Sequence, residues 1–348
     1  MKTYKNMFEK MVSVESFLNA WDEFKKGGKR KKRDVQAFEF RLEDNLFRLH
    51  RDLKNKRYKH GQYVGFYIRD PKARHIHKAE VRDRVVHHAL FKYINPIFEP
   101  TFIADSYSAR IGKGTHKGVE RLSTFAQKVF QTHGRCFILK CDIRKFFPTI
   151  DHEILLVIIS RRIKDPDVMR LIKIILGSFY SEFSGKGLKG VPIGNLTSQL
   201  FANIYMNELD QFIKHDLKVK YYIRYTDDFV IAHQDKDYLL GLQDKIASFL
   251  DTELKLSLHP DKLEIRKYRQ GVDFLGYVNL PKARVLRTKV RRRLFRKVKQ
   301  HVEEFRAGQI TEGTLLRSFD SYLGVLSHAD SHELEQELRH KFWEWIKE

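Results

Sequence analysis

Residues 223–231 read Ile-Arg-Tyr-Thr-Asp-Asp-Phe-Val-Ile, so two adjacent carboxylates lie between two apolar runs of strand length. This pattern predicts a β-hairpin that carries Asp227 and Asp228 at its tip. Neighbouring carboxylates repel each other and are costly to hold together unless a cation compensates their charge. The pair therefore indicates either a divalent-metal site or a polar tight turn.

A third carboxylate, Asp142, lies near the end of another apolar run of strand length, residues 137–143. If this strand lies beside the hairpin, Asp142 converges with Asp227 and Asp228. Such a cluster can hold two Mg²⁺ ions, which join a nucleophilic oxygen to a triphosphate. The alternative is that Asp142 caps the turn that follows it and that the pair fills a tight turn.

Between these segments, residues 190–203 read Gly-Val-Pro-Ile-Gly-Asn-Leu-Thr-Ser-Gln-Leu-Phe-Ala-Asn. Gly and Pro allow backbone to approach a flat ligand, and small polar side chains at a helix start can bind sugar, base or phosphate. The centre of the chain alternates strand-like and helix-like runs, with one further strand expected at Val272–Val278. Helical periodicity occurs in the first third of the chain, again from Val81 to Phe98, and after about Pro281. In this last region an apolar stripe is expected at Val290, Leu294, Val298, Val302 and Phe305. We therefore expect an α+β protein.

The net charge is the strongest compositional signal. The 348 residues include 66 Lys and Arg against 44 Asp and Glu, a formal charge of +22, and 42% of all residues are hydrophobic. That apolar content excludes disorder and small disulfide scaffolds. The charge predicts a polyanionic partner, either nucleic acid or anionic lipid. It is dense around Arg291–Lys299 and in Lys25–Arg33, which is either a solvated loop or a phosphate-contacting arm.

No segment is suited to a membrane. The longest aliphatic run, Ile154–Ile159, is far shorter than the roughly 18 to 20 residues of a membrane span, and the N-terminus has no apolar signal region. Cys136 and Cys141 are expected to point to opposite faces of an extended segment, which argues against a disulfide. We therefore expect a cytoplasmic protein.

Three segments, in this order, resemble the palm of a reverse transcriptase. They are the strand that ends in Asp142, the Ile-Gly-Asn-Leu-Thr-Ser-Gln of residues 193–199, and the Tyr-Thr-Asp-Asp of residues 225–228. The form Ile-Gly-x-x-x-Ser-Gln looks most like the reverse transcriptases of diversity-generating retroelements, because group II intron and retroviral relatives usually have Gln before the Gly.

The resemblance implies a right-hand polymerase in three parts. These are helical fingers with a basic N-terminal extension over residues 1–135, a ferredoxin-like palm of antiparallel sheet and helices over 136–280, and a basic helical thumb over 281–348. The implied activity is that of an RNA-directed DNA polymerase, which makes cDNA by two-metal nucleotidyl transfer. The thumb is expected to leave no room for an RNase H or endonuclease domain.

The resemblance also implies the catalytic residues. Asp142, Asp227 and Asp228 are expected to be catalytic and, together with Ile143, to hold two Mg²⁺ ions, for which Mn²⁺ can substitute. Lys262, in a His-Pro-Asp-Lys segment, is expected to protonate the pyrophosphate leaving group.

The incoming nucleotide is expected to contact several segments of the chain. Lys72 and Arg74 resemble the residues that neutralise its triphosphate. Phe147, five residues after Asp142, takes the place of the aromatic steric gate against ribonucleotides, and the alternative for it is a core Phe. Ile193 stands where many relatives have a Gln that touches the nucleotide, which implies low fidelity at template adenines. The loop residues expected to bind the nucleotide are Ile193, Gly194 and Gln199.

The primer and the template are expected to contact the hairpin, a segment that resembles the primer grip, and the basic thumb helix. The residues concerned are Tyr225, Leu275, Gly276, Tyr277, Arg291, Arg292 and Lys297. Reverse transcriptases of this type work with a structured noncoding template RNA and a small basic accessory protein that forms a pentamer. The expected partners are therefore template RNA, a primer with its cDNA strand, dNTPs and such an accessory protein, but no membrane.

Two other functions remain open. An antiphage or retron-like reverse transcriptase would copy its own noncoding RNA, and neighbouring genes would separate it from a retroelement enzyme. A non-catalytic RNA-binding scaffold would keep the positive surface but would need no intact carboxylates. Zinc is not expected at His75, His77, His87 and His88, because no Cys lies near and the catalytic metal should prefer oxygen ligands.

Overall fold

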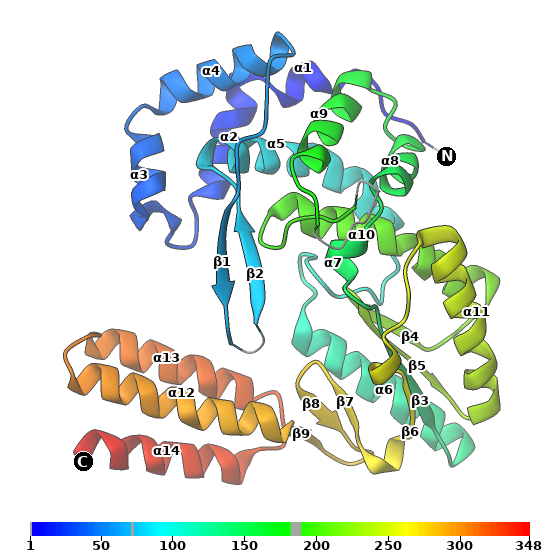
Figure 1. The fold of residues 1–348 in the computed structure, drawn as a ribbon. Helices are drawn as coiled ribbons and strands as arrows, with labels where there is room; N and C mark the ends of the chain where they lie inside the picture. The colour runs from blue at the N-terminus through cyan, green and yellow to red at the C-terminus, as the bar shows by residue number, and fades with distance from the viewer. Residues whose placement is uncertain (1, 71–72, 182–188) are drawn as a thin grey trace. The chain divides into compact units, whose positions relative to one another are not determined.

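The computed structural model describes residues 2–70, 73–181 and 189–348. The chain divides into two compact units, and each takes three segments from the sequence (Figure 1). Unit 1 comprises Met1–Ala104, Asp142–Lys218 and Gln243–Pro260, and unit 2 comprises Asp105–Cys141, Val219–Leu242 and Asp261–Glu348. The division into fingers, palm and thumb stays a prediction.

Unit 1 is mainly helical. Its α-helices are α1 (Phe8–Met11), α2 (Val14–Phe24), α3 (Arg33–Glu39), α4 (Leu42–Lys54), α5 (Val81–Phe98), α7 (Phe146–Thr149), α8 (His152–Ser160), α9 (Pro166–Gly177) and α10 (Leu196–Gln211). Short helical turns lie at Lys29–Lys31, Glu99–Thr101 and Phe212–Asp216. Asp165 provides hydrogen-bond acceptors for backbone amides at the starts of two helices. Its carboxylate caps α9 and also accepts from the Met7 amide at 2.6 Å. One buried side chain thereby joins α9 to the start of α1.

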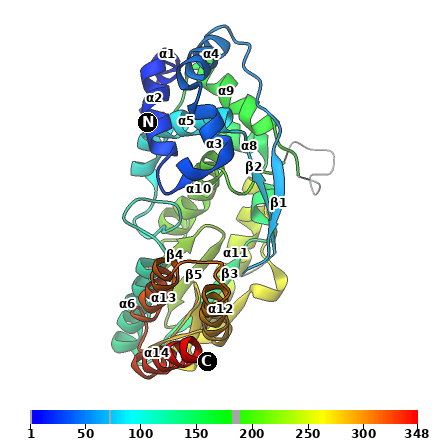
Figure 2. The same cartoon turned by 90° about the vertical axis from the view of Figure 1, so that its left-hand side faces the viewer.

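Unit 1 also contains a two-stranded hairpin, formed by β1 (Val64–Ile68) and β2 (Arg74–Lys78). The strands are antiparallel, with Phe66 opposite Ile76. Every residue of β1 is exposed, and Figures 1 and 2 show the hairpin extending beyond the helices of its unit. A two-stranded hairpin is only marginally stable by itself, so its base must be anchored to the rest of unit 1.

Unit 2 contains two sheets. The first has the strand order β4-β5-β3-β6, with β3 (Phe137–Asp142), β4 (Tyr222–Tyr225), β5 (Asp228–His233) and β6 (Glu264–Lys267). The pairs β3–β6 and β4–β5 are antiparallel. The second sheet is the antiparallel series β7 (Val272–Phe274), β8 (Tyr277–Asn279) and β9 (Arg284–Leu286). Short helical turns lie at Pro260–Lys262 and Tyr268–Gln270.

The helices of unit 2 are α6 (Thr115–His133), α12 (Thr288–Arg306), α13 (Glu312–Leu326) and α14 (His332–Lys347), and α11 (Lys236–Leu254) begins in unit 2 and ends in unit 1. Helices α12, α13 and α14 lie side by side in both views (Figures 1 and 2). Helix α12 buries Leu294, Val298 and Val302, which are spaced by four residues, and so confirms the predicted apolar stripe. Among the described helices, none has both the length and the apolar character that crossing a bilayer requires.

One apolar core connects the parts of unit 2. It includes residues of α6, of both sheets and of the last three helices, such as Leu122, Ile223, Tyr268, Val298 and Phe342. Burying each large side chain of this kind stabilises the fold by about 1.5 to 3 kcal/mol. The C-terminal helices therefore share one apolar core with both sheets.

The predicted single strand Val272–Val278 is wrong, because the segment folds back on itself. Phe274 pairs with Tyr277, and the two residues between them turn the chain. Leu275 has a φ of 52° and Gly276 a φ of 93°. A two-residue hairpin turn that follows strand twist needs positive φ at both central positions, and only the glycine signals this in the sequence.

Candidate active site

The two adjacent carboxylates lie at the end of the β4–β5 hairpin, as predicted from the sequence. Tyr225 is paired with Asp228, so Thr226 and Asp227 alone form the turn. Asp227 and Asp228 are both half-buried. Thr226 has a φ of 58°, a left-handed conformation that is unusual for a β-branched residue. The backbone that presents Asp227 is therefore held in a conformation that must be stabilised from outside the turn.

Arg224 provides part of that stabilisation. Its side chain is fully buried, and its Nη1 donates to the carbonyl oxygen of Thr226 at 3.0 Å. Its backbone pairs with a segment outside the hairpin: the Arg224 amide donates to the Asp105 carbonyl at 3.0 Å, and the Tyr107 amide donates to the Arg224 carbonyl at 2.9 Å. The segment bridges in parallel with β4 at Ser106. The hairpin is thus flanked on its β4 side by a third stretch of chain.

Asp142 is the last residue of β3, the strand beside β5, and lies where the chain passes from unit 2 into unit 1. Within unit 2, burial and the Asp228 carboxylate raise the pKa of the neighbouring Cys141 thiol. Within unit 1, the Asp142 carbonyl accepts from the His259 amide at 2.8 Å, and Ile143 forms an antiparallel bridge with Leu258. Backbone pairing therefore fixes the chain on both sides of this carboxylate.

The donor chemistry of the hairpin tip fits a divalent cation. Asp227 and Asp228 supply carboxylate oxygens, which Mg²⁺ prefers as ligands. In the described ranges of the chain, no three or more His, Cys, Asp or Glu side chains form a group that could hold a metal ion. It therefore stays a prediction that Asp142 meets the pair and that Ile143 is a metal ligand. Lys262 is the last residue of the turn Pro260–Lys262, and its role as proton donor also stays a prediction.

Of the two residues expected to contact the triphosphate, the structure describes Arg74. Lys72 lies outside the described residues. Arg74 is exposed and is the first residue of β2, opposite Ile68. The loop that was expected to bind the nucleotide lies against the same strand: the Ile193 carbonyl accepts from the His77 amide at 3.0 Å. The structure therefore brings together β2 and this loop within unit 1.

Gly194 and Asn195 explain how the loop approaches β2. Gly194 has a φ of 110°, and a Cβ at this position would lie 2.7 Å from a methyl carbon of Ile76. Asn195 is buried and donates from Nδ2 to the His77 carbonyl at 2.8 Å. Sequence reasoning missed Asn195, although a small polar residue just before a helix was a usable signal. Gln199 is exposed on α10.

Phe147 and Phe146 lie next to each other in α7 but differ in burial. Phe146 is fully buried, whereas Phe147 is half-buried. The two ring centroids are 5.4 Å apart, and the Phe147 carbonyl accepts from the Val191 amide at 2.9 Å. The core position of this pair therefore belongs to Phe146, and the assignment of Phe147 as a steric gate stays a prediction.

The residues expected to contact primer and template all lie in unit 2. The Tyr225 hydroxyl accepts from the Thr115 hydroxyl at 3.3 Å, and Leu275 and Gly276 form the β7–β8 turn. The Tyr277 hydroxyl donates to the Val325 carbonyl at 3.0 Å. The Tyr277 bond ties the predicted primer grip to α13, and the Tyr225 bond ties the β4–β5 hairpin to α6.

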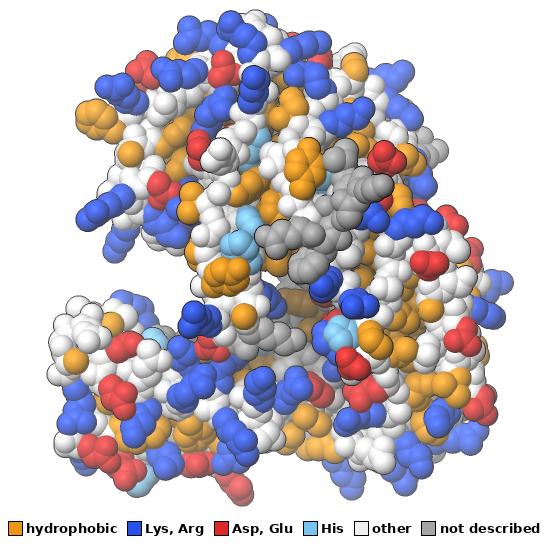
Figure 3. Space-filling view, in the orientation of Figure 1, with side chains coloured by type: hydrophobic (Ala, Val, Ile, Leu, Met, Phe, Trp, Pro, Cys, Tyr) orange, Lys and Arg blue, Asp and Glu red, His pale blue; other side chains and the backbone are white. Residues whose placement is uncertain are grey.

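Helix α12 presents the predicted basic face. Arg291 pairs with Glu337 of α14 at 2.8 Å, Lys297 contacts the Gln300 side chain at 3.2 Å, and Arg292 is exposed. In Figure 3, Lys and Arg side chains are scattered over the surface of both units. The net charge is therefore not confined to this helix.

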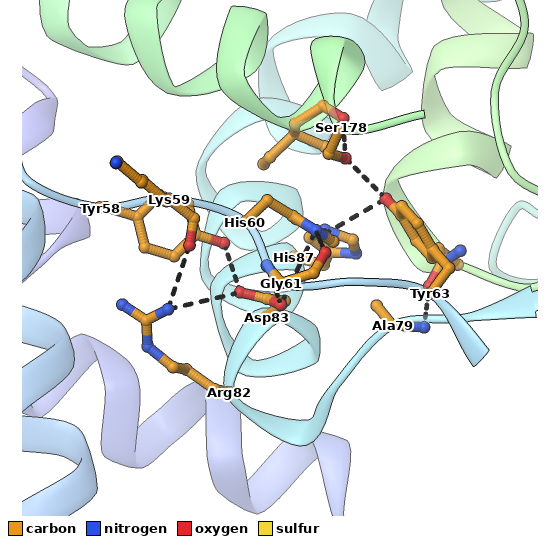
Figure 4. Close-up of polar contacts among 12 residues, drawn as sticks. Tyr58, Lys59, His60, Gly61, Tyr63, Ala79, Arg82, Asp83, His87 and Ser178 are labelled. Atoms are coloured by element: carbon orange, nitrogen blue, oxygen red, sulfur yellow. Dashed lines mark hydrogen bonds and ion pairs between the residues drawn. The ribbon is translucent and has the colours of Figure 1, made fainter. Parts of the chain in front are cut away.

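A buried polar network anchors the base of the β1–β2 hairpin (Figure 4). Asp83, on α5, accepts from the Tyr58 hydroxyl at 2.7 Å and from the Gly61 amide at 2.9 Å. Nε2 of His60 lies 3.1 Å from Nε2 of His87. Burial and Asp83 raise the pKa of Tyr58, and burial and His60 lower the pKa of His87. These side chains join the segment that precedes β1 to α5.

Comparison with known protein families matches residues 59–279 to the reverse transcriptase (RNA-dependent DNA polymerase) family. Protein YkfC of Escherichia coli K12 is 27% identical over 231 residues, which is 57% of this chain and 60% of that protein. The group II intron-encoded protein LtrA of Lactococcus lactis subsp. cremoris is 25% identical over 259 residues, which is 56% of this chain and 42% of LtrA. The chain thus spans about half the length of these curated relatives.

Proposed function

The chain belongs to the reverse transcriptase family, and on this premise we propose that it is an RNA-directed DNA polymerase. It extends the 3′-hydroxyl of a primer with dNTPs on an RNA template. The observation that carries the proposal is the β4–β5 hairpin, which presents Asp227 and Asp228 next to each other on a backbone held by Arg224. Adjacent carboxylates on such a support are suited to bind divalent cations beside phosphate groups.

The proposed catalytic group is Asp142, Asp227 and Asp228. With Ile143 they would hold two Mg²⁺ ions, for which Mn²⁺ can substitute. When bound, these ions offset the negative charge of the primer oxygen and of the triphosphate. Lys262 holds the proton that the pyrophosphate leaving group receives.

Incorporation of labelled dNTP on a primed RNA tests this proposal. Wild-type protein is expected to synthesise cDNA only when Mg²⁺ or Mn²⁺ is present, and Asp227→Asn is expected to abolish synthesis, because a carboxamide lacks the negative charge. Asp244→Asn, at an exposed position of α11, is the matched control and should polymerise normally. Normal synthesis by Asp227→Asn would refute the proposed catalytic role.

Selection of the nucleotide follows from the same proposal. Arg74 and Lys72 neutralise the triphosphate, and the half-buried ring of Phe147 excludes a ribose 2′-hydroxyl. Phe147→Ala should therefore incorporate ribonucleotides more readily relative to deoxyribonucleotides. Phe47→Ala removes an exposed ring from α4 and should leave this selectivity unchanged. Equal selectivity of both variants would reject the steric-gate assignment.

The subtype proposed is that of a diversity-generating retroelement, with error-prone synthesis at template adenines during mutagenic retrohoming. Support comes from Ile193, an aliphatic residue in the loop that lies against β2, which gives no polar contact to check base-pair geometry. Sequencing of cDNA should show mismatches concentrated at adenines in wild type, and fewer of them in Ile193→Gln. The same error spectrum in both proteins would rule out this explanation.

Similarity to LtrA, a group II intron-encoded protein, favours a second candidate: a reverse transcriptase that acts on an intron RNA. The flanking genome separates the candidates. A variable repeat with its template repeat supports the retroelement, intron boundaries support the second candidate, and a linked effector gene supports an antiphage or retron-like enzyme. Absence of any dNTP incorporation would leave the non-catalytic RNA-binding scaffold.

The partners proposed for the reaction are a structured template RNA, a primer with its cDNA strand, and a small basic pentameric accessory protein. The exposed basic residues of α12 support phosphate-backbone contacts, because each neutralised phosphate releases counterions and adds affinity. Two unbridged cysteines, Cys136 and Cys141, agree with the proposed cytoplasmic location.

A further inference from the structure

The turn that presents Asp227 is held by two contacts to a single residue, Thr226. The first is the bond from Arg224 Nη1 to the Thr226 carbonyl oxygen. The second is a hydrogen bond of 2.6 Å from the Thr226 hydroxyl to the hydroxyl of Ser108, which lies 118 positions earlier in the chain. The backbone carbonyl and the side chain of Thr226 are therefore both fixed from outside the turn.

The left-handed φ of Thr226 makes these contacts necessary. In a β-branched residue at positive φ, the crowded Cβ lies close to the backbone, and the right-handed or extended regions are favoured. Such a conformation persists only where its surroundings determine it. If Thr226 moved to one of the favoured regions, the chain after it would turn, and the Asp227 carboxylate would point elsewhere.

Ser108 belongs to a segment that is itself anchored. Asp105 and Tyr107 pair with the backbone of Arg224, and the Asp105 carboxylate accepts from Arg121 of α6 at 2.8 Å. The Gly114 amide donates to the Tyr107 carbonyl at 3.0 Å. The Tyr107 hydroxyl donates to Asp105 at 3.1 Å, and burial and this carboxylate raise the pKa of Tyr107. Ser108 therefore reaches Thr226 from a segment that is held by α6 as well as by β4.

We infer that Ser108 is a positioning residue: through its hydrogen bond to Thr226 it fixes the backbone from which the Asp227 carboxylate meets a divalent cation. This inference rests on the proposed polymerase function. Catalytic groups must be held within about 0.5 Å of their productive geometry. Loss of the Ser108 hydroxyl should therefore weaken cation binding at the tip, and should affect the binding of template much less.

The test is a double-mutant cycle with Ser108→Ala and Thr226→Val, which each remove one hydroxyl. Each single variant should need roughly 2 to 10 times more Mg²⁺ for half-maximal synthesis, as expected for one hydrogen bond. The double variant should need no more than either single one, because the same contact is lost. Ser108→Thr and Thr226→Ser keep the hydroxyls and should restore most of the wild-type response.

A second measurement does not depend on activity. Mn²⁺ binding followed by electron paramagnetic resonance should show a weaker site in Ser108→Ala and in Thr226→Val, with Asp227→Asn identifying the signal that belongs to the tip. Ser327→Ala removes a hydroxyl that donates to the Gly324 carbonyl at the end of α13, and should bind Mn²⁺ as wild type does.

Three outcomes are decisive. Multiplicative effects in the double variant would show that the two hydroxyls act independently, and the inference would be overturned. Unchanged Mn²⁺ binding together with a lower melting temperature would show that Ser108 only stabilises the fold. A wild-type protein that binds Mn²⁺ through Asp227 but does not polymerise would reject the proposed function. The effect of Ser108 on Mn²⁺ binding would then still be measured by electron paramagnetic resonance.

Discussion

The hairpins β1–β2 and β4–β5 are similar in length and opposite in environment. In β4–β5, the central residues of both strands are buried, and a further segment pairs along β4. In β1–β2, every residue of the first strand is exposed, and anchoring comes from the base through Asp83 and Asn195. The buried hairpin can hold a carboxylate in one place, whereas the exposed hairpin can present side chains to a ligand.

The largest expected effect is a difference in the stability of the protein between a variant of the buried hairpin and a variant of the exposed one. Phe229, in β5, is fully buried, and Phe66, in β1, is 44% exposed. Phe229→Ala should destabilise the protein by about 3 to 5 kcal/mol, because it leaves a cavity. Phe66→Ala should change stability by less than about 0.5 kcal/mol. Urea unfolding of both variants measures the difference, and equal midpoints would contradict the contrast.

The second comparison replaces one arginine in each hairpin. Arg224→Met removes the bond to the Thr226 carbonyl and should cost about 1.5 to 3 kcal/mol of stability. Its maximal rate of synthesis should fall at least about tenfold, which is a loss of roughly 1.4 kcal/mol in the transition state. Arg74→Met, at an exposed position, should keep its stability and raise the KM for dNTP instead. The contrast fails if Arg74→Met lowers the maximal rate as much as Arg224→Met does.

The third comparison concerns the loop beside β2. Gly194→Ala should cost about 1 to 2 kcal/mol, because the residue has a positive φ and its Cβ would meet Ile76. It should also raise the KM for dNTP, since the loop and β2 move apart. In Gly241→Ala, on α11, the new Cβ meets nothing within 4 Å. That control should be neutral or slightly stabilising. A raised KM for dNTP in Gly241→Ala would show that the effect is not specific to the contact between the loop and β2.

The last contrast is a pH dependence of α5, which anchors the exposed hairpin. Burial and Lys29 lower the pKa of His88 to about 4, and burial and His60 lower the pKa of His87. The unfolded state therefore takes up protons below about pH 6.5 that the folded state does not, so stability is present at neutral pH and falls as the pH drops.

Hydrogen exchange can locate this effect. Between pH 7 and pH 5, protection of α5 should fall by no more than about tenfold per histidine and pH unit below 6.5, after correction for intrinsic exchange. Protection of the β4–β5 hairpin should fall less. An equal fall in both regions would indicate global unfolding, and the link to the two histidines would be lost.

Local pattern was sufficient to predict several elements. Helix α5 spans Val81–Phe98, as its periodicity predicts, and the β4–β5 hairpin carries Asp227 and Asp228 at its end. In both cases the signal lies within the element itself: a helical repeat in one, and apolar runs on either side of polar turn residues in the other. The family match agrees with the residues that carried the resemblance.

Other features depend on partners far away in the sequence. A charged residue in a strand reads as solvent-facing, yet Arg224 is fully buried because the Asp105–Ser108 segment covers its side of the hairpin. The bond between Ser108 and Thr226 joins segments that no local pattern links. The positive φ of Leu275 is likewise set by tertiary structure, since leucine gives no signal for a turn of that kind.

The order in which the chain alternates between its two units has a consequence for synthesis on the ribosome. Unit 1 receives its last segment only at Pro260, and unit 2 only after α12, α13 and α14 have been made. At roughly 5 to 20 residues per second, α5 therefore waits at least about five seconds for α10, one of the helices it packs against. During that interval part of its apolar surface is exposed, so this chain should depend on chaperones more than a chain with sequential domains.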